Sequence, residues 1–336
     1  MRFEPTDEQR EFQASVRSLL QRHWSARHLR GAWDGQSEQA QYVWQRLSEL
    51  GALALLVPEE RGGAGASHVE LALALEEMGK AGYPLPVGES AGVVADLLAR
   101  ELGRDDELSA LVNGSMVAVV SATANAPVPY GQYAERILAL RGDEAHLIAT
   151  KDCGLAAVPT QDPTRGLAMG EIVTGPQTLV AHGAAVGRAT TAVWLVQAAE
   201  LLGLSQRMID MTRDYVVERR QFGVPIGAFQ SLKHQLADCL VQLEAARGLT
   251  WYAAYAIDAE PEAALLAART AKSAASNAAW VTNRVALQLH GGIGFTWEHD
   301  LHLWMKRSQA LERAHGSTRE HRLHIGRQLV DKTLAG

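Results

Sequence analysis

Apolar residues recur at helical spacing through the first third of the chain. Thr6 precedes two acidic residues and the first apolar stripe, so we expect it to cap the first helix. A stretch at 57–65 that contains one proline and three glycines indicates a loop. Helical periodicity is expected over four segments: 12–20, 43–50, 69–78 and 90–102. The N-terminal third is therefore predicted to be helical.

The pattern changes near Gly114. Short β-branched or alternating runs, separated by Gly, Pro, Asn and Asp, predict strands at 116–121, 137–140, 146–149 and 155–158. Long helices return after residue 187, at 189–218, 229–259, 261–289 and 299–313, followed by a C-terminal helix. The order predicts an N-terminal helical domain (1–113), a small middle β domain (114–185) and a C-terminal helical bundle (186–336).

Composition narrows the functional classes. The 336 residues are 47% hydrophobic and 21% charged, as in ordinary globular proteins, and the net charge of −6 provides no basic surface for nucleic acid. No apolar run is long enough to cross a membrane, and the N-terminus lacks a signal core. Cys153 and Cys239 follow no disulfide or metal spacing, so we expect a cytoplasmic enzyme without a metal.

An arginine pair follows the first long C-terminal helix. Arg219 and Arg220 stand just before Gly223 and Pro225, where a guanidinium could hold a pyrophosphate. Cations at a helix C-terminus also complement the helix dipole and need no ligand. Two further features favour the interpretation that the arginine pair binds a ligand. They are a second amide-containing segment, Gly227-Ala228-Phe229-Gln230, and the run Gln288-Leu289-His290-Gly291-Gly292 after a later helix.

In order and spacing, these segments closely resemble the C-terminal domain of the acyl-CoA dehydrogenase flavoprotein family. The resemblance covers nearly the whole chain: it includes the N-terminal segments Leu47–Gly51, Val57–Gly63, Glu76–Gly79 and Pro84–Pro86. The middle domain is the poor match and looks reduced. The family's fold is mostly α with a small β domain, arranged as an N-terminal helical domain, a middle β domain and a C-terminal four-helix bundle.

The resemblance implies an FAD site. FAD-binding residues carried over from the family are Arg219, Phe222, Gln230, Gln288, Gly291, Gly292 and Ser317. In the family, the residues that hold the adenosine diphosphate come from a neighbouring subunit, so an oligomer is implied. The substrate is an acyl-CoA thioester, whose carbonyl would lie near Gly316. The electron acceptor is an electron-transfer flavoprotein in most relatives and oxygen in the oxidases.

The chain departs from the family at the catalytic base. His315 occupies the place of the carboxylate that usually removes the α-proton, and an imidazole with an ordinary pKa near ~6.5 can act as a general base. An alternative is a histidine that caps a helix and has no catalytic role. At the family's second base position the chain has Val193, followed by Trp194, and the nearest acid, Glu200, is ~10 Å along the helix. Trp194 would either narrow the acyl tunnel or pack in the core.

Three hypotheses follow. The chain is an active FAD-dependent acyl-CoA dehydrogenase, or a catalytically silent subunit that pairs with a paralogue, or a flavin-free scaffold. The second resembles the short, divergent subunits of bacterial heteromeric dehydrogenases that degrade steroid side chains. The first two imply a homo- or hetero-tetramer, and the intact segments from Arg219 to Gly292 favour them over the scaffold.

Overall fold

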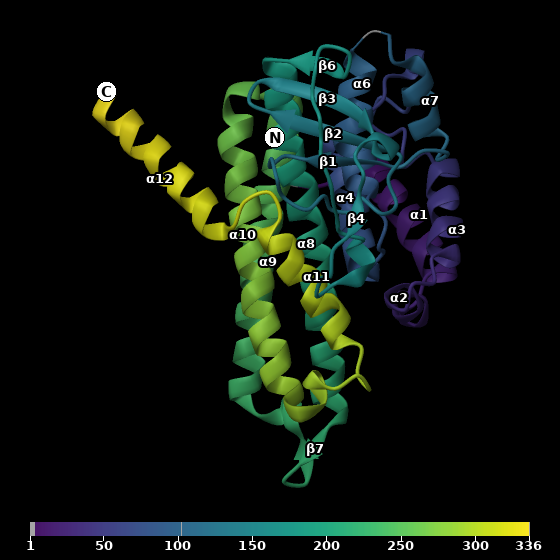
Figure 1. The fold of residues 1–336 in the computed structure, drawn as a ribbon. Coiled ribbons are helices and arrows are strands. Elements are labelled where there is room, and N and C mark those ends of the chain that lie inside the picture. The colour runs from purple at the N-terminus through teal and green to yellow at the C-terminus, as the bar shows by residue number, and fades with distance from the viewer. Residues whose placement is uncertain (1–3, 102, 336) are drawn as a thin grey trace.

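The computed structural model describes residues 4–101 and 103–335. Its N-terminal part is helical, as the sequence predicted (Figure 1). Capping boxes start two of these helices, because Thr6 pairs with Gln9 and Ser67 with Glu70. The helices are α1 (Asp7–His23), α2 (Ala26–Trp33), α3 (Glu38–Glu49), α4 (His68–Ala81), α5 (Val87–Glu89), α6 (Asp96–Arg100) and α7 (Asp105–Val112).

The helix expected over 90–102 begins earlier and contains a π-helical turn. α5 and α6 are joined without a break by Ser90–Ala95, which forms that turn. Residue 102 lies outside the described residues. π turns often accompany functional sites, and this one runs alongside α8, the helix at the centre of the molecule.

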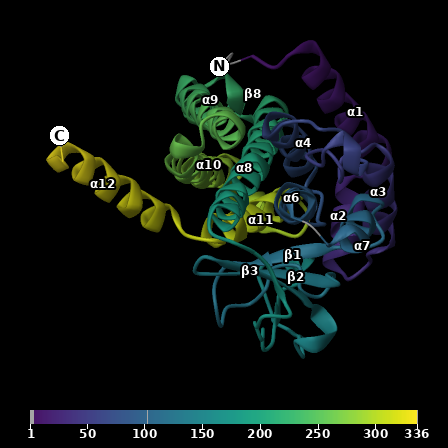
Figure 2. The ribbon, with the colours of Figure 1, turned by 90° about the horizontal axis from the view of Figure 1, so that it is seen from above.

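A four-stranded sheet follows, in the order β1-β2-β3-β6. β1 (Ala118–Ser121) pairs with β2 (Arg136–Arg141) in parallel. β3 (Glu144–Ala149) pairs with β2 on one side and with β6 (Leu179–His182) on the other, both in antiparallel orientation. A separate two-stranded sheet joins β4 (Ala156–Ala157) to β5 (Ala168–Met169). Figure 2 shows the main sheet against one side of the helices, where β1 contacts α5 and the turn Ser90–Ala95, and β6 contacts α8.

Long helices form the remainder of the chain. They are α8 (Ala184–Glu218), α9 (Gln230–Ala259), α10 (Pro261–His290), α11 (Leu301–Arg313) and α12 (Thr318–Ala335). α8 packs against α4, α9, α10 and α11, so it is the common wall of the N-terminal helices and the bundle. Glycines allow the closest contact, because a Cβ on Gly203 would lie 1.9 Å from the carbonyl oxygen of Glu76 on α4.

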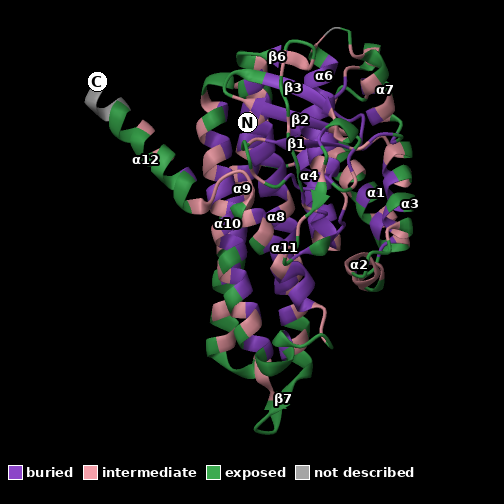
Figure 3. Cartoon of the chain, in the orientation of Figure 1, coloured by how far each residue is buried: buried purple, intermediate pink, exposed green. Residues whose placement is uncertain are grey.

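Two parts of the chain stand away from this core. A hairpin of β7 (Arg220–Gln221) and β8 (Val224–Pro225) projects from one end of the bundle, and α12 extends outward from α10 (Figure 1). Both are largely exposed in Figure 3, and Leu323 and Val330 on α12 are 49% and 56% exposed. Among the described residues, no helix is both long and apolar enough to span a bilayer.

Candidate functional site

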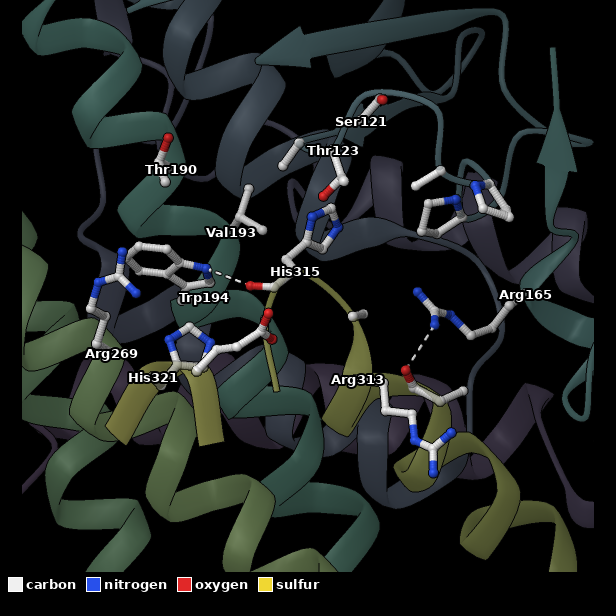
Figure 4. Close-up of a pocket in the computed structure, with 18 of the residues that line it drawn as sticks. Ser121, Thr123, Arg165, Thr190, Val193, Trp194, Arg269, Arg313, His315 and His321 are labelled. Atoms are coloured by element: carbon white, nitrogen blue, oxygen red, sulfur yellow. Dashed lines mark hydrogen bonds between the residues drawn. The ribbon is translucent and has the colours of Figure 1, made fainter. Parts of the chain in front are cut away.

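A cavity of about 790 Å³ lies where α8, α11, the start of α12 and the loop after β1 meet (Figure 4). It opens to solvent at one side, and His315 lies on its wall. The residues that line it include Ser121, Thr123, Pro129, Arg165, Thr190, Val193, Trp194, Arg269, Ala310, Arg313, His315, Gly316, Glu320, His321 and His324. Two of the site residues predicted from the sequence, His315 and Gly316, therefore face one cavity.

His315 stands on the tight loop between α11 and α12, with a left-handed backbone φ of 53°. The residue is half-buried, but its Nε2 atom is fully enclosed and has no hydrogen-bond partner among the described residues. Burial, followed by the nearby charges of Arg165 and Lys272, lowers the pKa of His315 to about 3. The imidazole is thus neutral at pH 7, and it titrates well below the ordinary value expected from the sequence.

Trp194 braces this loop. Its indole Nε1 donates a hydrogen bond of 2.9 Å to the carbonyl oxygen of His315. One face of the ring lies 4.1 Å from the guanidinium carbon of Arg269, and its centroid is 5.2 Å from that of His321. Trp194 is therefore buried and also forms part of the cavity wall.

Lys272 holds the end of α11 just before this loop. Its Nζ, fully buried, donates to the carbonyl oxygens of Leu311 at 2.7 Å and Glu312 at 3.1 Å. The Glu312 carboxylate in turn accepts from the backbone N–H of Thr318 at 3.2 Å. Burial lowers the pKa of Lys272 to about 7. Sequence reasoning missed Lys272, although a lysine in the alanine-rich run 271–279 was the available signal.

Ser317 and Gly316 shape the start of α12. The N–H and Oγ of Ser317 both donate to the Glu320 carboxylate, at 2.7 and 2.9 Å, which makes a helix cap. Gly316 has a φ of 109°, and a Cβ there would lie 2.9 Å from Nε2 of His321. Glycine is thus required at 316, and Ser317 in this chain is engaged within its own loop.

The cavity is lined by more positive than negative charge. Arg165, Arg269 and Arg313 face it, against a single acid, Glu320. Arg165 is only 4% exposed, and its Nη1 donates to the carbonyl oxygen of Ala310 at 3.2 Å. Its Nε and Nη2 have no hydrogen-bond partner among the described residues. These two donors are therefore enclosed and unpaired in a residue of the cavity wall.

Glu200 is not a free acid. Its carboxylate accepts from Nε of Arg307 at 2.6 Å, and Arg307 also donates to the hydroxyl of Tyr130 at 3.1 Å. Glu200 and Tyr130 line a small inner cavity together with Glu89 and Gln197. Burial raises the pKa of Glu89 to about 7, although its carboxylate accepts a 2.8 Å bond from the N–H of Val120.

Six of the predicted FAD-binding residues lie at the far end of the bundle, whereas the seventh, Ser317, stands on the loop between α11 and α12. Tyr215, one turn before Arg219, stacks on His290 at 4.5 Å between ring centroids, which brings the ends of α8 and α10 together. Arg219 follows Trp194 by 25 positions along α8, a separation of about 38 Å at ~1.5 Å per residue. These residues and the His315 cavity therefore lie at well-separated places along α8.

This far end is open. Phe222 is 91% exposed with a φ of 53°, and Arg219, Gln230, Gln288, Gly291 and Gly292 are all exposed. The aromatic ring nearest to Phe222 among those described is Phe229, at 6.2 Å between centroids. The chain's own aromatics therefore do not cover these residues, whose amides, guanidinium and glycines fit a phosphate-bearing ligand. The described residues contain no group of three or more His, Cys, Asp or Glu side chains placed to bind a metal ion.

Two family descriptions match the sequence: "Acyl-CoA dehydrogenase, N-terminal domain" over residues 6–106 and "Acyl-CoA dehydrogenase, C-terminal domain" over residues 186–330. The acyl-CoA dehydrogenase IpdE2 of Mycolicibacterium smegmatis is 34% identical over 316 residues, which cover 94% of this chain and 96% of that protein. IpdE2 of Mycobacterium tuberculosis is 34% identical over 315 residues, or 93% and 92% of the two chains.

Solved structures share the fold throughout. The ChsE4-ChsE5 complex from Mycobacterium tuberculosis superposes with a TM-score of 0.85 at 22% identity, over 98% of this chain and 99% of that chain. A Tcur3481-Tcur3483 steroid ACAD variant gives a TM-score of 0.85 at 24% identity, also over 98% and 99%. These alignments extend through the middle of the chain, between the two matched domains.

Proposed function

Because this chain belongs to the acyl-CoA dehydrogenase family, we propose that it is one subunit of an FAD-dependent enzyme that removes hydrogen from the α and β carbons of an acyl-CoA thioester. The observation that carries the proposal is the separation along α8 of about 38 Å, at ~1.5 Å per residue, between Trp194 at the cavity and Arg219 at the exposed end. Each end supplies part of a flavin site, and an oligomer completes it.

At the exposed end, Arg219 and Gln230 would hold the phosphates of an FAD whose ring lies in another protomer's cavity, with Phe222, Gln288, Gly291 and Gly292 around the adenosine. Their exposure supports this assignment. Bound FAD would supply the hydride acceptor. The cavity of this chain would receive the ring of a second FAD, with Ser317 next to it.

In that cavity His315 is the candidate base. Its neutral Nε2 could accept the α-proton, and Gly316 would lie beside the thioester carbonyl. Lys272 and Trp194 fix the loop that presents both residues. The low pKa of His315, about 3, makes its Nε2 a weak acceptor until the local positive charge is reduced.

That same pKa favours a second candidate function. Val193 and Trp194 occupy the other base position, Glu200 is paired to Arg307, and the one acid of the cavity wall among the described residues, Glu320, accepts hydrogen bonds from Ser317. The chain would then be a silent partner, which contributes its Arg219 end to the cavity of a catalytic paralogue. The relatives solved as the ChsE4-ChsE5 and Tcur3481-Tcur3483 pairs are consistent with a hetero-tetramer. The open Arg219 end argues against a flavin-free scaffold.

The two buried cysteines are unpaired, as in a reducing cytoplasm, which we propose as the location. An electron-transfer flavoprotein or oxygen would reoxidise the flavin.

One comparison tests the proposal. The chain is purified alone and after co-expression with a paralogous subunit, and the absorption spectrum is recorded before and after anaerobic addition of acyl-CoA. Flavin bound by the chain alone and bleached by substrate indicates an active homomer, and flavin found only on co-expression indicates a paired subunit. A colourless protein in both preparations would refute the FAD assignment.

A further inference from the structure

Arg165, a residue of the main cavity's wall, has two donors without a partner among the described residues. The residue is 4% exposed, and only its Nη1 is engaged, with the carbonyl oxygen of Ala310. The two donors left without a partner among the described residues, Nε and Nη2, lie on the same edge of the guanidinium. That edge matches the two oxygens of a carboxylate, which it binds through parallel hydrogen bonds. A buried guanidinium with this edge unpaired is costly unless a ligand satisfies it.

The position of Arg165 identifies which part of a thioester it would meet. Figure 4 shows it across the cavity from Trp194, with His315 between them. On its other side, its guanidinium carbon is 5.3 Å from the ring centroid of Tyr130, which lines the inner cavity. Arg165 therefore lies beyond His315 on the side of the inner cavity. An acyl chain with its α carbon at His315 would extend toward it.

The wall of the inner cavity is mostly apolar but has a polar part. The side chain of Gln197 is 3% exposed, and neither its oxygen nor its nitrogen has a partner among the described residues. Glu89, Tyr130 and Glu200 complete the polar part of its wall. A plain hydrocarbon chain would leave the Gln197 amide and the two free donors of Arg165 without hydrogen bonds, whereas an oxygenated acyl group would accept hydrogen bonds from them.

We propose that the acyl group of the substrate carries its own carboxylate, which the Nε and Nη2 atoms of Arg165 bind in bidentate fashion. The inference rests on the proposed acyl-CoA function and adds the substrate class: thioesters of dicarboxylic acids, rather than of simple fatty acids. Gln197 supplies a further hydrogen bond to an oxygen of the same acyl group.

Equilibrium binding tests this directly. Isothermal titration of the assembled flavoprotein compares adipoyl-CoA with hexanoyl-CoA, which have six acyl carbons each and differ in the terminal carboxylate. We expect adipoyl-CoA to bind roughly 10- to 100-fold more tightly, the worth of a charge-assisted pair. Arg165→Gln should bring the ratio close to one. Arg136→Gln, a control at the start of β2 away from the cavity, should leave it unchanged.

Arg165→Lys provides a second measurement if glutamine disturbs the loop. Lysine keeps the positive charge but lacks the two parallel N–H donors of the guanidinium, so the preference for adipoyl-CoA should fall without vanishing. Equal binding of the two thioesters to the wild-type protein, or a full preference in Arg165→Gln, would overturn the inference and leave the proposed function standing. Failure of both thioesters and of free coenzyme A to bind would refute the proposed function, and this inference with it.

Discussion

His315 occupies a position where its neighbours decide its chemistry. Arg165 and Lys272 both disfavour its protonation, so the free site holds a neutral imidazole at all physiological pH values. A bound carboxylate would neutralise one of these charges and raise the pKa of His315. The substrate itself would then make the imidazole a stronger base at the moment when a base is needed.

If His315 is the base, His315→Gln should lower the rate of flavin reduction by acyl-CoA by about 100-fold or more, the usual worth of a general base. Stopped-flow bleaching of the flavin measures this rate. Because the pKa of His315 in the free protein is about 3, the second-order rate constant at low substrate concentration should be flat between pH 5 and 8, so its pH profile over that range does not identify the base. His324→Gln, on the rim of the same cavity, is the control. An unchanged rate in His315→Gln would exclude His315 as the base.

His302 predicts how stability depends on pH. It lies between Trp33 and Trp297, at 5.8 and 4.4 Å between centroids, and its two ring nitrogens are enclosed without partners among the described residues. Burial, Lys306 and Arg30 lower its pKa to about 4. The unfolded chain, with a pKa near ~6.5, takes up the proton first, so folding stability is lost as the pH falls from ~6.5 toward 4.

His302→Phe should therefore stabilise the protein by about 1–2 kcal/mol more at pH 5 than at pH 8. Urea unfolding at the two pH values gives the difference. His234→Phe replaces an exposed histidine on α9 and should show no such pH dependence. If His302→Phe raised the free energy of unfolding equally at both pH values, packing rather than protonation would explain its effect.

At the scale of elements, the crossing of α4 and α8 sets the back wall of the inner cavity. Gly79 and Gly203 let the two backbones meet, since a Cβ would lie 2.2 Å from the carbonyl oxygen of Glu200 and 1.9 Å from that of Glu76, respectively. Gln197 and Glu200 stand on the same stretch of α8. A side chain at either glycine would therefore move the polar wall as well as the helices.

Gly203→Ala should cost more than about 3 kcal/mol, because the clash is with backbone that cannot move aside. Chemical denaturation measures the cost. Gly248→Ala is the matched control, because this glycine is also inside a long helix but a Cβ added there would meet nothing within 4 Å. Alanine there should be neutral or stabilising by up to about 1 kcal/mol. Similar effects of the two changes would show that helix propensity, not contact, controls both.

Local pattern sufficed for the elements and for the exposed end. Helical periodicity predicted α8, α9 and α10 nearly to their ends, and the chain order placed Arg219 and Gln288 near helix termini. It could not supply pairings between distant positions. The partner of Glu200 is Arg307, 107 positions away, and Lys272 reaches Leu311 across 39. The Nε and Nη2 atoms of Arg165 are likewise unpaired because, among the described residues, the fold brings no acceptor within reach of them. No sequence pattern predicts this.

For the whole molecule, the consequence is that flavin and quaternary structure are linked. Under the proposed function, the cavity and the Arg219 end of one chain would belong to different flavin sites, so a lone protomer would offer only half of each. Within the described part of the chain, α12 also lacks a packing partner on part of its surface, since it projects from α10 with the apolar side chains of Leu323 and Val330 exposed (Figure 3). Ligands that bind only the assembled form stabilise it by mass action. FAD should therefore hold the oligomer together.

Arg219→Ala should weaken FAD retention by about 1.5–3 kcal/mol, the loss of a charge-assisted hydrogen bond. Size-exclusion chromatography at decreasing protein concentration, with flavin absorbance followed across the elution profile, measures it. In the wild type, flavin should leave only when the oligomer dissociates, whereas Arg219→Ala should shift both events to higher protein concentration. Arg213→Ala, also exposed on α8 but paired with Asp214 at 2.8 Å, should behave as wild type. A monomer that keeps its flavin would contradict the shared site, because one chain would then suffice to bind the cofactor.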